Sequence, residues 1–155
     1  KKIRSLYHVF CIEDPFQEDD LASWAKLTAE LGETTKIIGD SFLATNKAKT
    51  QKAITEKTCN TVLIKPNQTG TISETIEVIK MAKEAKWQVI MSHRSGETND
   101  DFIADFAVGI GADYTKFGPP NRGERVAKYN RLSQIEFEIN QSNNEKSINT
   151  NPEKM

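Results

Sequence analysis

The 155-residue sequence predicts an α/β fold of about five βα units with parallel strands. Three observations carry this prediction. Short apolar runs are typical of buried strands, amphipathic segments lie between the runs, and each run ends in an ionisable residue. Successive ends are spaced by about 25 residues, which is the length of one strand, one helix and two short loops. Alternation of this kind favours a parallel sheet, whose carboxyl edge collects functional groups.

The first four apolar runs are rich in β-branched or large apolar residues and show little alternation, as expected for strands covered on both faces. The fifth run is weaker and is assigned as a strand because it keeps the spacing. The predicted strands are Val9 to Glu13, Ile37 to Asp40, Val62 to Lys65, Val89 to His93 and Tyr114 to Lys116.

Helices are predicted between the strands from apolar spacing and capping residues. The first follows the acidic residues 18–20 and stops at Gly32, and the second begins near Asn46 and ends near Glu56. The third begins after Thr71, the fourth after Asn99 or Asp100, and the last runs from about Gly123 to Ile139.

Residues 140–155 are rich in Asn, Ser, Lys and Glu and have almost no apolar content. Such a composition cannot bury a core and predicts a disordered tail. The predicted organisation is therefore one domain over residues 1–139, followed by a polar tail over residues 140–155.

Composition excludes several classes of function. The net charge of -1 gives no electrostatic reason to expect a nucleic-acid or membrane partner, and no apolar run approaches the roughly 20 residues that span a bilayer. Cys11 and Cys59 both lie in apolar runs, which predicts buried thiols in a reduced cytoplasmic protein. The chain begins without Met and in the middle of a pattern, so we expect a fragment of a longer protein.

The strand-end residues can be assigned chemistry. Glu13 and Asp40 supply hard carboxylate oxygens that suit Mg²⁺, although each can instead cap the following segment. Lys65 ends an apolar strand, where loss of water favours a neutral amine that can act as a base; a structural salt bridge is the alternative.

The segment Ser92-His93-Arg94-Ser95-Gly96-Glu97 offers a forked guanidinium and a turn with exposed N–H groups, both suited to an anion. His93 can instead be a histidine packed beside the loop. Lys116 can neutralise a carboxylate or enolate oxygen. Together these groups suit proton abstraction next to a carboxylate.

Several long strings, in this order, resemble the enolase family. They are residues 12–16 (IEDPF), Gly39-Asp40 with residues 44–46 (ATN), residues 63–71 (LIKPNQTGT), residues 92–98 (SHRSGET) with 102–105 (FIAD), and residues 118–120 (GPP) with 124–130 (ERVAKYN). The resemblance runs from about Leu6 to Ile139 and implies the last five strands of an eight-stranded TIM-like barrel, which is an incomplete barrel.

The resemblance also implies an activity, the magnesium-dependent interconversion of 2-phosphoglycerate and phosphoenolpyruvate in glycolysis and gluconeogenesis. Lys65 would be the general base at C2, and Glu13 and Asp40 would bind Mg²⁺, with Glu13 also contacting substrate. His93, Arg94 and Ser95 would bind substrate beside Ser92, and Lys116 would hold the substrate carboxylate. A lysine base that works with Mg²⁺ ions is already known for the enolase superfamily, so this pattern comes with the resemblance and not from the residues alone.

Two departures from the family pattern qualify this expectation. Ser41 stands where the family's Gly-Asp motif continues with a second aspartate, a residue expected beside the metal ligands without binding the ion. The family's third metal carboxylate and its general acid lie N-terminal to the region that this chain resembles, so the chain alone is expected to be inactive.

Two rival interpretations remain. One is a superfamily enzyme that acts on another carboxylate acid, against which the complete phosphate loop argues. The other is a divergent or truncated, non-catalytic enolase-like protein. The resemblance further implies a cytoplasmic lyase with a small-molecule substrate and a homodimeric full-length parent.

Overall fold

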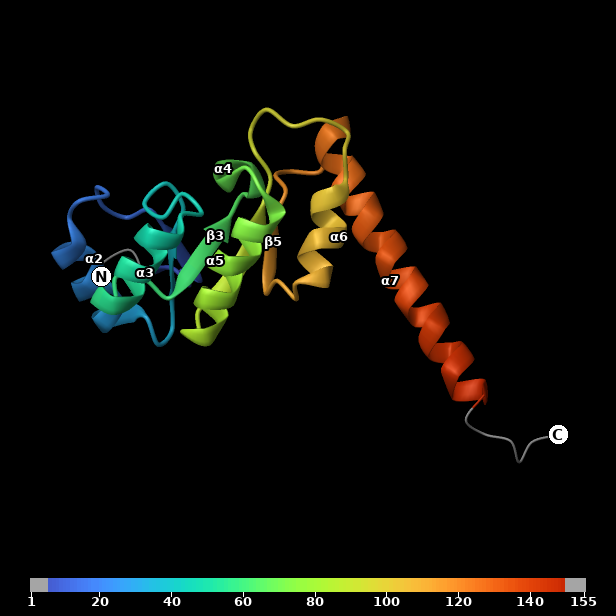
Figure 1. Cartoon of the computed structure of the whole chain (residues 1–155), viewed down its shortest axis with the longest axis horizontal. Coiled ribbons are helices and arrows are strands. Elements are labelled where there is room, and N and C mark those ends of the chain that lie inside the picture. Colours follow the sequence, from blue (N-terminus) through green and yellow to red (C-terminus); the bar gives the residue numbers. More distant parts are fainter. Residues whose placement is uncertain (1–5, 150–155) are drawn as a thin grey trace. The chain divides into compact units, whose positions relative to one another are not determined.

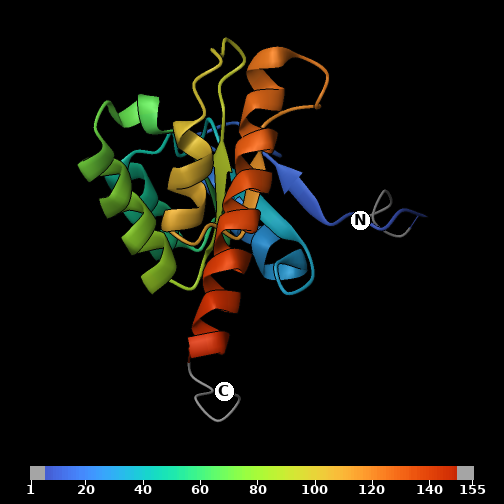
Figure 2. The same ribbon diagram turned by 90° about the vertical axis from the view of Figure 1, so that its right-hand side faces the viewer.

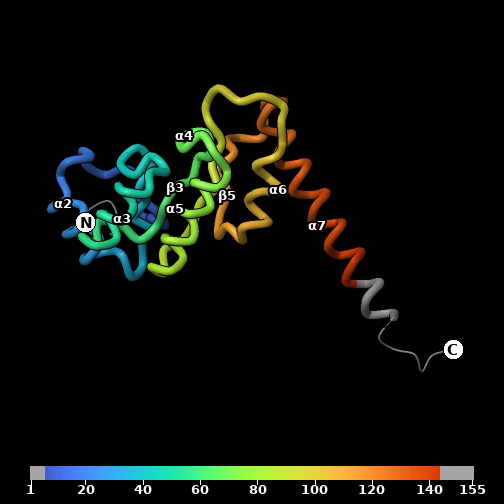
Figure 3. The backbone as a smooth tube through the Cα atoms, in the orientation of Figure 1, coloured from blue at the N-terminus to red at the C-terminus, as the bar shows by residue number. Residues whose placement is uncertain are grey.

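The structure is a computed structural model that describes residues 6–149, with side chains through residue 143. The described residues form two compact units. We call residues 6–92 with 112–116 the sheet unit, and residues 93–111 with 117–149 the helical unit. Along the chain each strand is followed by one or two helices (Figure 1), and Figure 3 traces the same backbone as a tube.

The sheet unit contains, within residues 6–149, a sheet of five parallel strands in the order β1-β2-β3-β4-β5. This arrangement confirms the predicted α/β fold and forms an open half-barrel. Four strands differ from the predicted bounds by one or two residues at one or both ends. The strands are β1 (Cys11–Glu13), β2 (Lys36–Gly39), β3 (Thr61–Ile64), β4 (Gln88–Ser92) and β5 (Tyr114–Lys116).

Four helices of the sheet unit connect its strands within residues 6–92. They are α2 (Leu21–Leu31), α3 (Lys47–Glu56), α4 (Pro66–Thr69) and α5 (Ile72–Glu84). Capping residues begin three of them, because the side chains of Asp20, Asn46 and Thr71 each accept a hydrogen bond from a backbone N–H in the first turn. Helix starts at Asn46 and Thr71 were predicted, and Asp20 belongs to the acidic stretch expected just before the first helix. The single turn of α4, with Pro66 at its start, was not predicted because it is too short to show a period.

The core of the sheet unit lies between the central strands and their helices. Every residue of β3 is buried, and α5 packs on β3 and β4 while α2 packs on β2. Helix α3 packs against α5 (Figure 2). The Trp24 ring of α2 is fully buried and stacks on Phe42 with 4.6 Å between ring centroids. This packing fixes the loop after β2, where Asp40 lies.

The helical unit consists of the loop after β4, helix α6 (Phe102–Gly109), the segment after β5 and helix α7 (Gly123–Asn149). Helix α6 packs against α7, and Arg131 of α7 forms two hydrogen bonds with the Asp105 carboxylate, at 2.6 and 2.8 Å. Asp101 occupies the N-cap of α6 without a side-chain bond, while the Asp100 carboxylate accepts from the Phe102 N–H.

Helix α7 continues through Asn149, so the expectation that residues 140–149 lack regular structure is wrong. Neither glycine nor proline interrupts this stretch, and extending a formed helix costs little once it is nucleated. The expectation of little burial holds for residues 140–143, which are exposed. Residues 150–155 of the predicted tail lie outside the described residues.

The two cysteines differ in environment, and the prediction that both are buried is wrong for Cys11. Cys11 is exposed because β1 has a partner strand on one side only among the described residues. Cys59 is buried, and burial raises the pKa of its thiol to about 12. Of the helices within residues 6–149, none has the length and apolar character needed to cross a bilayer.

Candidate functional site at the carboxyl ends of the strands

Four of the five predicted side chains lie at the carboxyl ends of strands in the sheet unit. Glu13 and Lys116 are the last residues of β1 and β5, and Asp40 and Lys65 directly follow β2 and β3. Because all strands are parallel, these ends share one edge of the sheet, as predicted. His93 directly follows β4 in the chain but belongs to the helical unit, so its position beside the other four remains a prediction.

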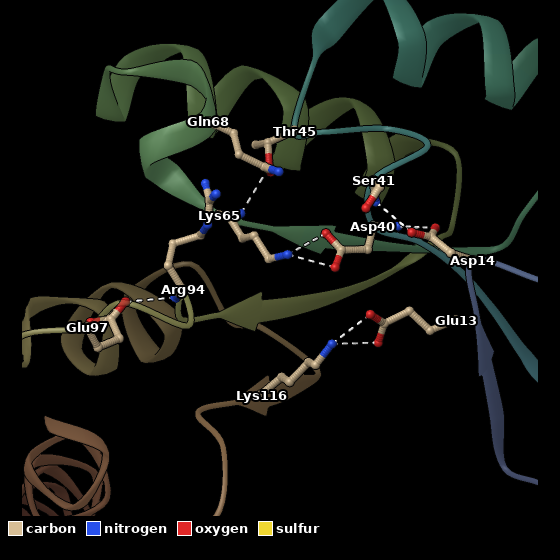
Figure 4. A network of polar contacts seen from close by, with 10 residues as sticks. All are labelled: Glu13, Asp14, Asp40, Ser41, Thr45, Lys65, Gln68, Arg94, Glu97 and Lys116. Carbon is tan, nitrogen blue, oxygen red and sulfur yellow. Dashed lines mark hydrogen bonds and ion pairs between the residues drawn. The ribbon is translucent and has the colours of Figure 1, made fainter. Parts of the chain in front are cut away.

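Lys65 and Asp40 form the most buried ion pair of this edge (Figure 4). The Lys65 ammonium donates to both oxygens of the Asp40 carboxylate, at 2.6 and 2.7 Å. Only 15% of the Lys65 side chain and 9% of the Asp40 side chain are exposed. Both charged groups are therefore largely removed from water and satisfy one another.

Glu13 and Lys116 form a second, wetter pair. The Lys116 ammonium donates to both Glu13 oxygens at 2.7 Å, with 45% and 34% of the two side chains exposed. Their strands, β1 and β5, are the first and last of the sheet. In a flat sheet these two strands would lie about 19 Å apart. The contact therefore requires a strongly curved sheet, as in part of a barrel, and brings the ends of β1 and β5 together.

Asp14 supports the turn that carries Asp40. Its backbone is left-handed, with φ of 42°, and its carboxylate accepts from the N–H groups of Asp40 and Ser41, at 2.9 and 2.8 Å. Sequence reasoning missed this contact, since it joins segments 26 residues apart. The available signal was an aspartate directly after a strand end. Ser41 itself is exposed, and its backbone makes the contact with Asp14.

The backbone of Lys65 is held by a second pair that the sequence did not indicate. The Lys65 N–H donates to the Thr45 hydroxyl at 2.9 Å, and that hydroxyl donates to the Gln68 side chain at 2.7 Å. Thr45 is fully buried. Lys65 is thus held at two points, its backbone by Thr45 and its ammonium by Asp40.

The predicted anion loop, residues 92–97, divides between the two units. Ser92 ends β4 and is buried, whereas Arg94 and Ser95 are exposed in the helical unit. The Arg94 N–H donates to the Glu97 carboxylate at 2.8 Å, which closes the loop on itself. Burial alone would raise the pKa of Glu97, but hydrogen bonds from Arg94 and Lys128 outweigh it and lower that pKa.

A metal ion would find two suitable ligands here. Glu13 and Asp40 offer the hard carboxylate oxygens that suit Mg²⁺, and in the structure each carboxylate is paired with an ammonium, whose place a bound cation would take. Within residues 6–143, no cluster of three or more histidine, cysteine, aspartate or glutamate side chains is arranged to hold a metal ion. The two carboxylates therefore fit part of a magnesium shell.

Comparisons with known proteins agree with this geometry. The family model described as "Enolase, C-terminal TIM barrel domain" matches residues 1–152. The chain is 54% identical over 139 residues to the "Enolase" of Solanum lycopersicum, covering 90% of this chain and 31% of that protein.

Two further relatives show the same extent of similarity. "Enolase B" of Dictyostelium discoideum is 52% identical over 138 residues, which cover 89% of this chain and 31% of that protein. The "Enolase" of Helicobacter pylori (strain HPAG1) is 50% identical over 139 residues, which cover 90% and 33%. The chain thus spans about a third of the length of the curated relatives that it matches.

Proposed function

Because the chain belongs to the enolase family, matching its C-terminal TIM-barrel domain, we propose that it supplies the base side of a site that interconverts 2-phosphoglycerate and phosphoenolpyruvate. The observation that carries this proposal is the pairing of Lys65 with Asp40 and of Lys116 with Glu13 at the carboxyl ends of the strands. Two lysines and two carboxylates in this arrangement suit proton removal next to a carboxylate.

Lys65 is the general base in this proposal. Its neutral amine takes the proton from C2 of 2-phosphoglycerate, and the electron pair of the C2–H bond moves into the substrate carboxylate. The burial of Lys65, its anchored backbone and the nearby Asp40 keep the amine in one place. The proton taken from C2 converts the Lys65 amine to an ammonium, the form whose hydrogen bonds the Asp40 carboxylate accepts in the structure.

Lys116 balances the charge that grows on the substrate carboxylate once C2 is deprotonated. This role requires that the Lys116 ammonium exchange its contact with Glu13 for one with substrate. The pair is half-exposed, so the exchange costs little. The C3–O bond then breaks and hydroxide leaves, protonated by an acid that the resemblance assigns to a segment N-terminal to the matched region.

Glu13 and Asp40 would hold Mg²⁺ in this proposal, and Glu13 would also face substrate. When bound, the ion would supply positive charge that stabilises the doubly negative carboxylate of the intermediate. His93, Arg94 and Ser95, next to Ser92, would bind the phosphate through the forked guanidinium and the exposed N–H groups of the turn. The proposal further implies a cytoplasmic enzyme and a homodimeric complete subunit.

The test uses a chimeric subunit in which this chain replaces the matching segment of the Solanum lycopersicum enolase. We expect it to form phosphoenolpyruvate from 2-phosphoglycerate with added Mg²⁺, followed by ultraviolet absorbance. The Lys65→Ala variant should lose this activity. The matched control is Lys47→Ala, whose exposed pair with Glu77 lies outside the site. A folded chimera without turnover would overturn the proposed function.

A second candidate is a non-catalytic, enolase-like protein. Ser41 favours it, because the resemblance places an aspartate at this position, beside Asp40. An inactive chimera that gains activity on Ser41→Asp would support this candidate. An active chimera with Ser41 in place would contradict it.

A further inference from the structure

Lys128 of α7 is a fully buried lysine, with 0% of the residue exposed. A buried ammonium is costly unless it is hydrogen-bonded or paired with an opposite charge. Among the site residues predicted from the sequence, none is Lys128. A lysine on a helix is ordinarily assigned to the solvent-facing side.

The contacts of Lys128 converge on the loop after β4. Its ammonium donates to the backbone carbonyls of Thr98 and Asp100, at 3.0 and 2.8 Å. It also donates to the backbone carbonyl of Glu124, in its own helix, at 2.8 Å. It also forms an ion pair with Glu97 at 2.9 Å. A single buried group thus binds three residues of the loop that leads into α6.

Glu97 passes this constraint to the predicted phosphate-binding residues. One of its oxygens faces Lys128, and the other accepts from the Arg94 N–H at 2.8 Å. Between Arg94 and Glu97 lie Ser95 and Gly96, which are both exposed, and glycine has the greatest backbone freedom of any residue. Without a brace, ordering this turn would cost conformational entropy each time a ligand binds.

We propose that Lys128 is a positioning residue for the turn from Arg94 to Gly96, acting through Glu97 and holding the turn in one conformation before a phosphate-bearing ligand arrives. Lys128 itself touches no ligand in this account. The ligand class rests on the proposed function, whereas the bracing of the turn rests on the contacts within the helical unit.

The alternative is that Lys128 only stabilises the packing of α7. Arg131 separates the two possibilities, since it lies on the same helix and its guanidinium hydrogen-bonds to Asp105 of α6 and to Glu138 of α7. A general loss of α7 packing should therefore follow from either substitution, and a loss of bracing from Lys128 substitution alone.

Four variants of the chimeric subunit test the proposal. Lys128→Met removes the ammonium and keeps the apolar stem, Glu97→Ala removes the link, and Glu97→Gln keeps an oxygen acceptor for the Arg94 N–H. Arg131→Met is the matched control. Two quantities are measured: amide hydrogen exchange over residues 93–98, which needs no activity, and the KM and kcat for 2-phosphoglycerate.

We expect faster exchange over residues 93–98 in Lys128→Met and Glu97→Ala, with partial recovery in Glu97→Gln and no change in Arg131→Met. The KM should rise about 10- to 100-fold in the first two variants, since misplaced binding groups carry losses of this order. A purely structural role would lower the active fraction, and hence kcat, without changing the KM.

Unchanged exchange in folded Lys128→Met, or an equal increase in Arg131→Met, would overturn the proposal. If Lys128→Met does not fold, the same two measurements on Glu97→Ala test the proposal in its place. An inactive chimera in which exchange still responds as expected would support the bracing and refute the proposed function, so the two claims fail separately.

Discussion

Asp14 and Asp40 show at the residue scale how neighbouring carboxylates take different tasks. Asp14 accepts two backbone hydrogen bonds and fixes the turn after β2, whereas both oxygens of Asp40 face the Lys65 ammonium. Asp14 has a left-handed backbone in the turn after β1, and Asp40 directly follows β2. Asp14 therefore positions the residue that pairs with the proposed base.

The environment of Glu97 can be tested through the pH dependence of the free energy of unfolding. Its pKa is lowered in the folded protein, because hydrogen bonds from Arg94 and Lys128 outweigh the effect of burial. The stability that it contributes is therefore present above the unfolded pKa, about 4.3, and is lost as the pH falls through the lower folded value.

Glu97→Gln should accordingly be less stable than the parent chimera at pH 7, and the difference should narrow as the pH falls from about 5 to 3. Urea unfolding followed by circular dichroism at several pH values measures this difference. A difference that stays constant down to pH 3 would contradict the assigned environment of Glu97.

At the scale of elements, the strands and most helices could be predicted because their signals are local. An apolar run with a charged end, or a capping residue before a periodic segment, lies within a few residues in the chain. The same local reasoning placed Glu13, Asp40, Lys65 and Lys116 at one edge, since parallel strands share it.

The features that escaped prediction depend on tertiary contacts or on weak local signals. The supports of the site, Asp14 and Thr45, act across 26 and 20 residues of chain. The burial of Lys128 depends on how the loop after β4 folds back on α7. The length of α7 escaped because its polar end has neither an apolar period nor a residue that stops a helix.

Gly39, the last residue of β2, allows a prediction about the element that carries Asp40. A Cβ at this position would lie 2.6 Å from Cγ and 2.7 Å from Cδ1 of Leu43, a fully buried side chain. Gly39→Ala should therefore lower the free energy of unfolding by about 1–3 kcal/mol, as overpacking does elsewhere.

The control for this prediction is Gly109→Ala at the end of α6, where nothing lies within 4 Å of the added Cβ. It should leave the free energy of unfolding unchanged or raise it by up to about 1 kcal/mol, because alanine is the better helix former. Both changes in the free energy of unfolding are to be measured by urea unfolding of the chimeric subunit. Equal effects of the two substitutions would refute the packing argument at Gly39.

At the scale of the whole molecule, the proposed activity belongs to a subunit about three times the length of this chain. A polypeptide of residues 1–155 alone should show no detectable dehydration of 2-phosphoglycerate, even with millimolar Mg²⁺. Glu13 and Asp40 supply only two carboxylates for the ion, and among the described residues no third joins them. The resemblance also assigns the acid that protonates the leaving hydroxide to another segment.

This prediction is checked by the absorbance of phosphoenolpyruvate, with the Lys65→Ala polypeptide as the control for contaminating host enolase. Turnover by the 155-residue polypeptide that disappears in the control would show that the chain needs no further catalytic groups.

The proton at C2 of 2-phosphoglycerate gives the most direct test of the central claim, that Lys65 is the base. In deuterated water the chimeric subunit should replace this proton with deuterium, as followed by proton NMR. Lys65→Ala should slow the exchange by about 10²–10⁴-fold, the usual contribution of a general base, and leave the KM much less affected. Exchange that continues in Lys65→Ala at the rate of the parent chimera would contradict the account.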